Sequence, residues 1–106
     1  MTDTQDNNME MIVNSIKNRQ RLIISYNDKT RCIEPHRCGR SVNGKLLLRA
    51  VQIAVIGETT IAEWRLFDVE KIESCMTDSM NFVPRHDIGY TESDQMIPEV
   101  ICEIND

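Results

Sequence analysis

The chain is poor in the residues from which catalytic loops and cofactor sites are built. Its 106 residues include only four glycines, three prolines and two histidines, and aromatic side chains make up 5% of the total. No glycine-rich phosphate loop, Gly-x-Ser-x-Gly element or His-Glu-x-x-His element occurs. So few glycines also leave little material for a flexible lid. We therefore expect a protein that is not an enzyme and has no catalytic residues.

Long hydrophobic runs are missing as well. The longest apolar stretch, residues 46–56, is interrupted by Arg49 and Gln52, whereas a membrane-spanning helix needs roughly 18 apolar residues. The first eight residues are polar and acidic, unlike a secretory signal. Hydrophobic residues make up 41% of the chain and charged residues 27%, which is typical of globular proteins. We expect one small, soluble, cytoplasmic domain with no membrane partner.

None of the four cysteines belongs to a Cys-x-x-Cys element. Cys32, His36 and Cys38 lie close in the sequence, but an extended strand would spread them too far apart for a tetrahedral zinc site. We expect no metal and no cofactor, and thiols that stay reduced and partly buried.

The net charge of −5 conceals a strong asymmetry along the chain. Residues 12–49 contain nine basic and two acidic residues, whereas residues 50–106 contain three basic and twelve acidic ones. Two interpretations remain open from charge alone. The basic part forms a cationic patch for an anionic partner, or the two parts neutralise each other across the fold.

Residues 7–20 predict a helix, because Met9, Ile12, Val13 and Ile16 recur at helical spacing. Asn7 and Glu10 resemble a capping box at its start. After the helix the pattern becomes strand-like, and Pro35 predicts either an edge position or a bulge. The expected strands are residues 22–26, 31–38, 46–56 and 59–67, with turns at residues 27–28, 43–44 and 57–58. Residues 69–72 indicate a short helical segment, and residues 98–104 fit either a last strand or a short helix.

One helix followed by short strands and tight turns predicts a mainly β fold with an N-terminal helix. The architecture that suits it is a small, strongly bent β-barrel of the Sm-like or SH3-like type. We expect a disordered N-terminus over residues 1–8, the domain over residues 9–83, and a partly flexible acidic extension over residues 84–106.

Several side chains on the expected strands suit the recognition of an anion. Arginine offers a planar fork of donors for phosphate or carboxylate, and Tyr26 and Trp64 offer flat surfaces for stacking a base. The alternative is a purely structural role, in which the charges protect edge strands from aggregation and the aromatic rings pack in the core. The candidate residues are Ser25, Tyr26, Arg31, His36, Arg49 and Arg65.

Four elements in order resemble the WYL domain family, a module of bacterial transcription regulators, over roughly residues 11–83. They are the helix and strand "IVNSIKNRQRLIISY", the Arg-x-x-x-Pro element in "TRCIEPHRC", the "NGKLLLRA" stretch and the closing "WRLFDVEKIES". "FVPRHDI" resembles the Phe-x-Pro segment that often follows in the family. In the closing stretch Arg65, Phe67 and Ile72 match the family signature. The chain departs from it at residues 46–48, three leucines in place of the naming Trp-Tyr-Leu, and at Asp68, where an arginine is common.

The resemblance implies a Sm-like barrel that acts as a sensor or adaptor for a transcription or defence effector of a bacterium or phage. Carried over by motif, the ligand-binding residues are Ser25, Tyr26, Arg31, His36 and Arg65. The implied ligand is single-stranded nucleic acid or a nucleotide-like anion. Because only about eight residues precede the helix, we expect a stand-alone module that acts through a protein effector. The alternative is a protein-binding or homo-oligomerisation module without a small ligand, in which an edge strand or the acidic tail recruits a partner. The tail could also cover the basic groove.

Overall fold

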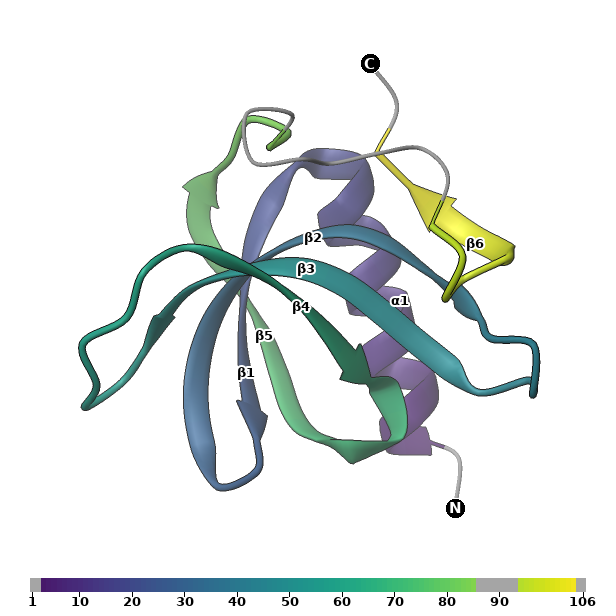
Figure 1. The fold of residues 1–106 in the computed structure, drawn as a ribbon. Helices are drawn as coiled ribbons and strands as arrows, with labels where there is room; N and C mark the ends of the chain where they lie inside the picture. Colours follow the sequence, from purple (N-terminus) through teal and green to yellow (C-terminus); the bar gives the residue numbers. More distant parts are fainter. Residues whose placement is uncertain (1–2, 86–93, 105–106) are drawn as a thin grey trace.

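The computed structural model describes residues 3–85 and 94–104 of the chain. As expected, the fold is mainly β with one N-terminal helix (Figure 1). In chain order its elements are α1 (Asp3–Asn18), β1 (Gln20–Tyr26), β2 (Lys29–Arg40), β3 (Leu46–Val55), β4 (Glu63–Asp68), the 3-10 helix η1 (Val69–Lys71), β5 (Ile72–Asn81) and β6 (Glu99–Glu103).

The strands form one antiparallel sheet in the order β4-β3-β2-β1-β5. The C-terminal strand β6 also pairs with β2. The strand β1 pairs with residues 29–33 of β2, and β6 pairs with residues 37–40, which β1 does not reach. Within the described ranges, β4 pairs only with β3 and β5 only with β1. Over residues 3–85 and 94–104 the sheet is bent but open, and these residues form no closed barrel (Figure 1).

The helix begins earlier than the sequence predicts. It starts at Asp3, within the segment for which the sequence predicts disorder. The expected cap at Asn7 is wrong, because Asn7 lies inside the helix. Asn8 is buried instead, and its Nδ2 donates a hydrogen bond to the Ile72 carbonyl at 3.1 Å, which ties the helix to the start of β5.

All three predicted turns are confirmed. Asn27 and Asp28 have φ of 52° and 62°, the left-handed conformation that a two-residue hairpin requires. Gly44 and Gly57 also have positive φ, at 82° and 87°. Asparagine, aspartate and glycine tolerate this conformation best, so local chemistry determines where the strands reverse.

Strand β5 is missing from the sequence prediction, although the short helical segment before it is confirmed as η1. Most side chains of β5 are exposed, and these include the apolar Met76 and Met80 as well as polar residues. The strand therefore lacks a clear apolar alternation. The open choice for residues 98–104 is resolved in favour of a strand, β6, so residues 99–103 of the C-terminal extension belong to the sheet.

The core lies between α1 and the sheet. Ile12 and Ile16 of α1 are buried against apolar side chains from the strands, among them Leu22, Ile33 and Phe67. Burial of each such side chain contributes about 1.5–3 kcal/mol of transfer free energy. None of the helices within residues 3–85 and 94–104 has the length and apolar character to span a membrane.

Candidate anion-binding site

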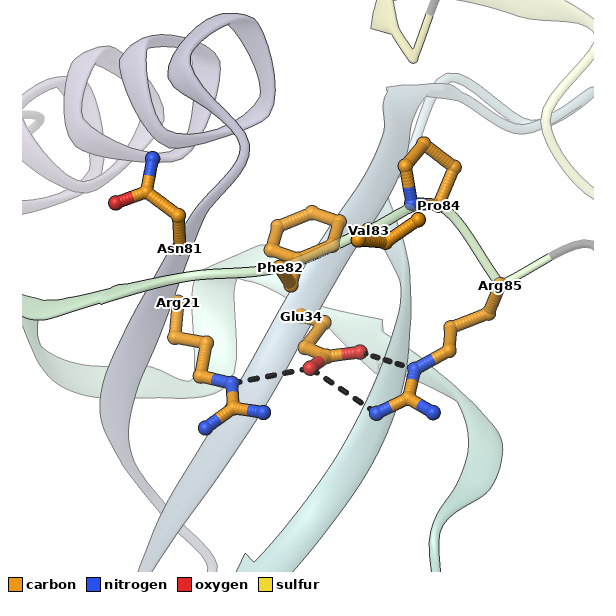
Figure 2. A pocket seen from close by; sticks show the side chains of 7 residues that line it. All are labelled: Arg21, Glu34, Asn81, Phe82, Val83, Pro84 and Arg85. Carbon is orange, nitrogen blue, oxygen red and sulfur yellow. Dashed lines mark hydrogen bonds and ion pairs between the residues drawn. The ribbon is translucent and has the colours of Figure 1, made fainter.

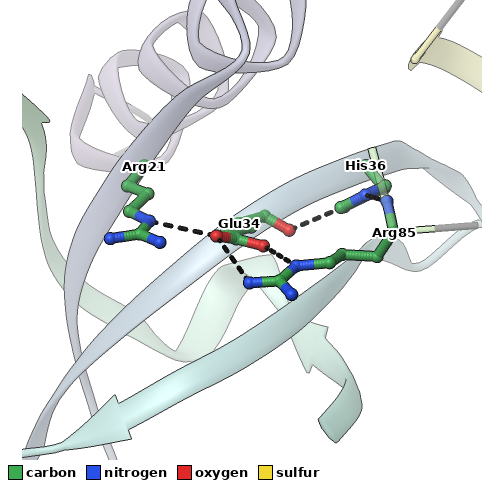
Figure 3. A network of polar contacts seen from close by, with 4 residues as sticks. All are labelled: Arg21, Glu34, His36 and Arg85. Carbon is green, nitrogen blue, oxygen red and sulfur yellow. Dashed lines mark hydrogen bonds and ion pairs between the residues drawn. The ribbon is translucent and has the colours of Figure 1, made fainter. Parts of the chain in front are cut away.

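A buried carboxylate bound by two arginines forms the most unusual polar cluster in the described part of the chain. Glu34 on β2 is fully buried, with 0% exposure. Arg21 on β1 donates from Nε to its Oε2 at 3.0 Å. Arg85 donates from Nε to Oε1 at 2.6 Å and from Nη2 to Oε2 at 3.2 Å (Figure 3). Both arginines keep about a quarter of their side-chain surface exposed.

The backbone explains why a carboxylate is buried at this position. Residues 34–36 of β2 lie between the stretches paired with β1 and with β6. Pro35 cannot donate a ladder hydrogen bond, and the register of β2 with β3 shifts directly after it, so of the two alternatives for Pro35 the structure shows the bulge. The segment after β5, residues 82–85, reaches this gap and brings Arg85 to Glu34.

His36 attaches this segment to the sheet. Its Nδ1 lies 2.8 Å from the Glu34 carbonyl oxygen, and its Nε2 lies 3.0 Å from the Arg85 backbone nitrogen. A carbonyl can only accept and a backbone N–H can only donate, so the ring is the neutral tautomer with the proton on Nδ1. The ring also packs against Trp64 and Phe82, with centroids 4.8 Å and 5.0 Å away.

A pocket of about 540 Å³ opens beside this cluster (Figure 2). Figure 2 shows the two guanidinium groups on either side of the Glu34 carboxylate. The three charged side chains among the lining residues are two arginines and one glutamate. The side chains that line the pocket are Arg21, Glu34, Asn81, Phe82, Val83, Pro84 and Arg85.

The predicted groove residues do not meet in an open hollow. Arg31 is only 6% exposed; its Nη1 donates to Gln52 Oε1 at 2.8 Å and its Nε donates to the Tyr26 carbonyl at 3.2 Å. His36 is fully buried in the contacts described above. Arg65 is exposed on β4 beside Glu63. The prediction that these three side chains line one solvent-open groove is therefore corrected, because two of them serve the packing of the sheet.

The remaining candidates also have structural partners. The Tyr26 ring packs edge-on against Phe67 with centroids 5.1 Å apart, and its hydroxyl accepts the Asp68 N–H at 3.1 Å. Ser25 lies half-buried in the ladder between Thr30 and Ser74. Trp64 contacts His36 and is partly exposed. The interpretation of these aromatic rings as packing residues fits their contacts better than a free stacking surface.

Much of the basic segment is neutralised by the acidic part of the chain, as one of the two charge interpretations expects. Four basic side chains of residues 12–49 form ion pairs with acidic residues that come later in the sequence. These pairs are Lys29–Glu58, Arg37–Glu103, Lys45–Asp68 and Arg49–Asp94. Arg49, another predicted candidate, is bound in bidentate fashion, at 2.8 Å and 3.3 Å.

The residues of the cluster itself are absent from the predicted site, although a signal for one of them exists in the sequence. Glu34 is one of two acidic residues in the basic segment and lies within an otherwise strand-like pattern. A carboxylate that becomes buried needs cationic partners. The identity of those partners depends on how β1 and residues 82–85 are placed. His86 and Asp87, which follow Arg85 in the sequence, lie outside the described residues.

Within residues 3–85 and 94–104, no group of three or more His, Cys, Asp or Glu side chains is placed to hold a metal ion. Searches for similarity to family models, to curated proteins and to solved structures find no match to the chain. The resemblance to the WYL domain family therefore remains a prediction from sequence motifs.

Proposed function

We propose that the chain is a non-enzymatic regulatory module of the WYL-like type that binds an anionic ligand in the cytoplasm and modulates a transcription or defence effector. The ligand class is single-stranded nucleic acid or a nucleotide. We assign the bent sheet to the Sm-like barrels. The strands β4 and β5 lie at opposite ends of the strand order but are joined by the single 3-10 turn η1, and this short connection supports the assignment.

The observation that carries the proposal is the Arg21 guanidinium, which lines the pocket beside Glu34. Within the described residues Arg21 hydrogen-bonds through Nε only, so its two terminal amino groups remain as donors. A phosphate has the charge and the acceptor geometry for such donors. We therefore centre the proposed site on Arg21, beside Arg85, in place of the motif residues Arg31 and His36.

Two substitutions test the site in opposite directions. Arg21→Gln removes one donor group but leaves Glu34 paired with Arg85, and we expect affinity for a short single-stranded oligonucleotide to fall roughly tenfold. Glu34→Gln removes the carboxylate that competes for the Arg21 guanidinium, so we expect binding to become tighter. Fluorescence anisotropy with labelled DNA, RNA and nucleotides measures both effects.

The matched control is Arg40→Gln, which removes the same charge from an exposed position six residues along β2 from Glu34. Titrations at about 50 mM and about 200 mM salt show whether Arg21→Gln lowers the salt slope by about one unit. Melting curves separate loss of binding from loss of folding. The proposal fails if Arg21→Gln binds like Arg40→Gln and Glu34→Gln gains no affinity.

A second candidate function is homo-oligomerisation or protein binding through the sheet edges. It is favoured by β5, which pairs only with β1 in the described ranges and exposes Met76 and Met80 to 58% and 54%. Light scattering tests it: a stable oligomer that Met80→Lys dissociates, together with absence of anion binding, supports this function over the first. A monomer at all concentrations argues against self-association.

A further inference from the structure

Two of the four cysteines face each other across a pair of strands. Cys38 of β2 and Cys102 of β6 are direct antiparallel partners, although they are far apart in the sequence. The other two have no cysteine opposite them: Cys32 pairs with Ile23 and Ala54, and Cys75 with Ile24. All four thiols are free in this structure.

Both side chains of the pair point to the same face of the sheet, towards α1. Cys38 is fully buried in the core, and Cys102 packs against that core from the edge. The Cys102 Sγ lies 3.9 Å from the carbonyl oxygen of Val13 on α1. Since directly opposite residues share a face, the two thiols lie in the same layer of the molecule.

The spacing of such partners suits a covalent bond. Opposite residues of an antiparallel pair have Cα atoms about 4.5–5.5 Å apart, and disulfides span Cα separations of about 4.4–6.8 Å. Their Cβ atoms must approach by at most about 1 Å. The short edge strand β6 provides this movement, because it has one neighbour and its register with β2 already shifts between Cys38 and Gly39.

We propose that Cys38 and Cys102 form an oxidation site that closes a cross-strand disulfide when a peroxide reaches the protein. Hydrogen peroxide oxidises the half-buried Cys102 thiol to a sulfenic acid and leaves as water. The Cys38 sulfur then attacks the sulfenic sulfur, the S–S bond forms, the S–O bond breaks, and a second water carries away the oxygen and the remaining thiol proton. The two sulfur atoms lose two electrons in total, and the peroxide gains them.

The surroundings make this a slow reaction at neutral pH, because the thiolate is the reactive form. Burial raises the pKa of Cys38 to about 12; the charge of the neighbouring Cys102 thiolate adds to this shift, and a hydrogen bond with the Cys102 backbone opposes it. Burial also raises the pKa of Cys102, and the charge of Glu103 on β6 adds to this shift. The charge of Lys17 on α1 and a hydrogen bond with the Glu103 backbone lower the same pKa. Oxidation should therefore accelerate as pH rises.

The bond would fix β6 to β2. In the reduced state β6 is held by its ladder with residues 37–40 and by the ion pair between Glu103 and Arg37. A disulfide restricts the unfolded chain between the two cysteines, and we expect the thermal midpoint to rise by roughly 10 °C. Amide exchange of residues 99–103 should slow in parallel.

The test treats the full-length wild-type chain with hydrogen peroxide and maps its disulfides by mass spectrometry after non-reducing digestion. We expect a loss of about 2 Da and a peptide that joins Cys38 to Cys102. Cys102→Ser should abolish this product and the rise in thermal midpoint, whereas Cys75→Ser and Cys32→Ser should retain both. Sulfinic acid without a cross-link, or a disulfide between any other pair of cysteines, overturns the proposal. The decisive measurement uses the wild-type chain, so the result does not depend on how the variants fold.

Discussion

Arg31 and Arg65 are both arginines on strands of one sheet, yet they have opposite surroundings. Arg31 is buried, lies over the Tyr26 ring at 5.5 Å from its centroid and is hydrogen-bonded to Gln52. Arg65 is exposed and has a surface ion pair with Glu63. A buried hydrogen bond from a charged donor stabilises the fold by about 1.5–3 kcal/mol, whereas an exposed ion pair contributes about 0–1 kcal/mol.

These surroundings predict different effects of the same substitution. Arg31→Ala should lower the free energy of unfolding by about 2–3 kcal/mol, because it also leaves the buried Gln52 amide without this partner. Arg65→Ala should change it by less than about 0.5 kcal/mol. Urea denaturation of both variants measures the difference. Equal destabilisation would contradict a structural role for Arg31.

At the scale of elements, the attachment of β6 depends on one residue without a side chain. Gly39 lies opposite Val100 on β6 and is buried. A Cβ at this position would stand 2.1 Å from the Glu99 carbonyl oxygen, which is closer than any real contact. The glycine is therefore required by the close approach of β6 and not by a turn.

Gly39→Ala should displace β6 from β2, since the atom nearest to its Cβ is the backbone carbonyl oxygen of Glu99, which cannot move without the strand. We expect faster amide exchange over residues 99–103 and a loss of stability of about 1–3 kcal/mol. Gly44→Ala is the control: its Cβ meets nothing, but its φ of 82° costs about 1 kcal/mol of backbone strain. Normal exchange of β6 in Gly39→Ala would disprove the steric requirement.

At the scale of the whole molecule, the acidic part of the chain compensates the basic part. Asp94 receives two hydrogen bonds from Arg49, which lies on β3, and one from the Met96 backbone N–H. Burial alone would raise the pKa of Asp94, but these hydrogen bonds, with the charges of Arg49 and Arg37, outweigh it and hold the pKa below its ordinary value.

A carboxyl whose folded-state pKa is depressed adds stability at pH values above its unfolded pKa of about 4, and this stability is lost as pH falls through the folded pKa. Asp94→Asn should therefore lower the free energy of unfolding by about 1–2 kcal/mol at neutral pH and flatten its decline in acid. Thermal denaturation between about pH 2 and pH 7 measures this, with the exposed Glu99→Gln as control. An unchanged acid profile would show that the Asp94–Arg49 pair adds nothing.

Local chemistry in the sequence determined the β-rich class, the N-terminal helix, the three turns and the bulge at Pro35. These features depend on apolar periodicity and on residues that accept positive φ, and both act over a few neighbouring positions. The polar edge strand β5 was missed because it has no clear periodic pattern. Tertiary structure alone decided which arginines contact Glu34, which acidic residue neutralises Arg49 and which cysteine faces Cys38. The physical reason is that strand register and the path of residues 82–85 bring together side chains that are distant in the chain.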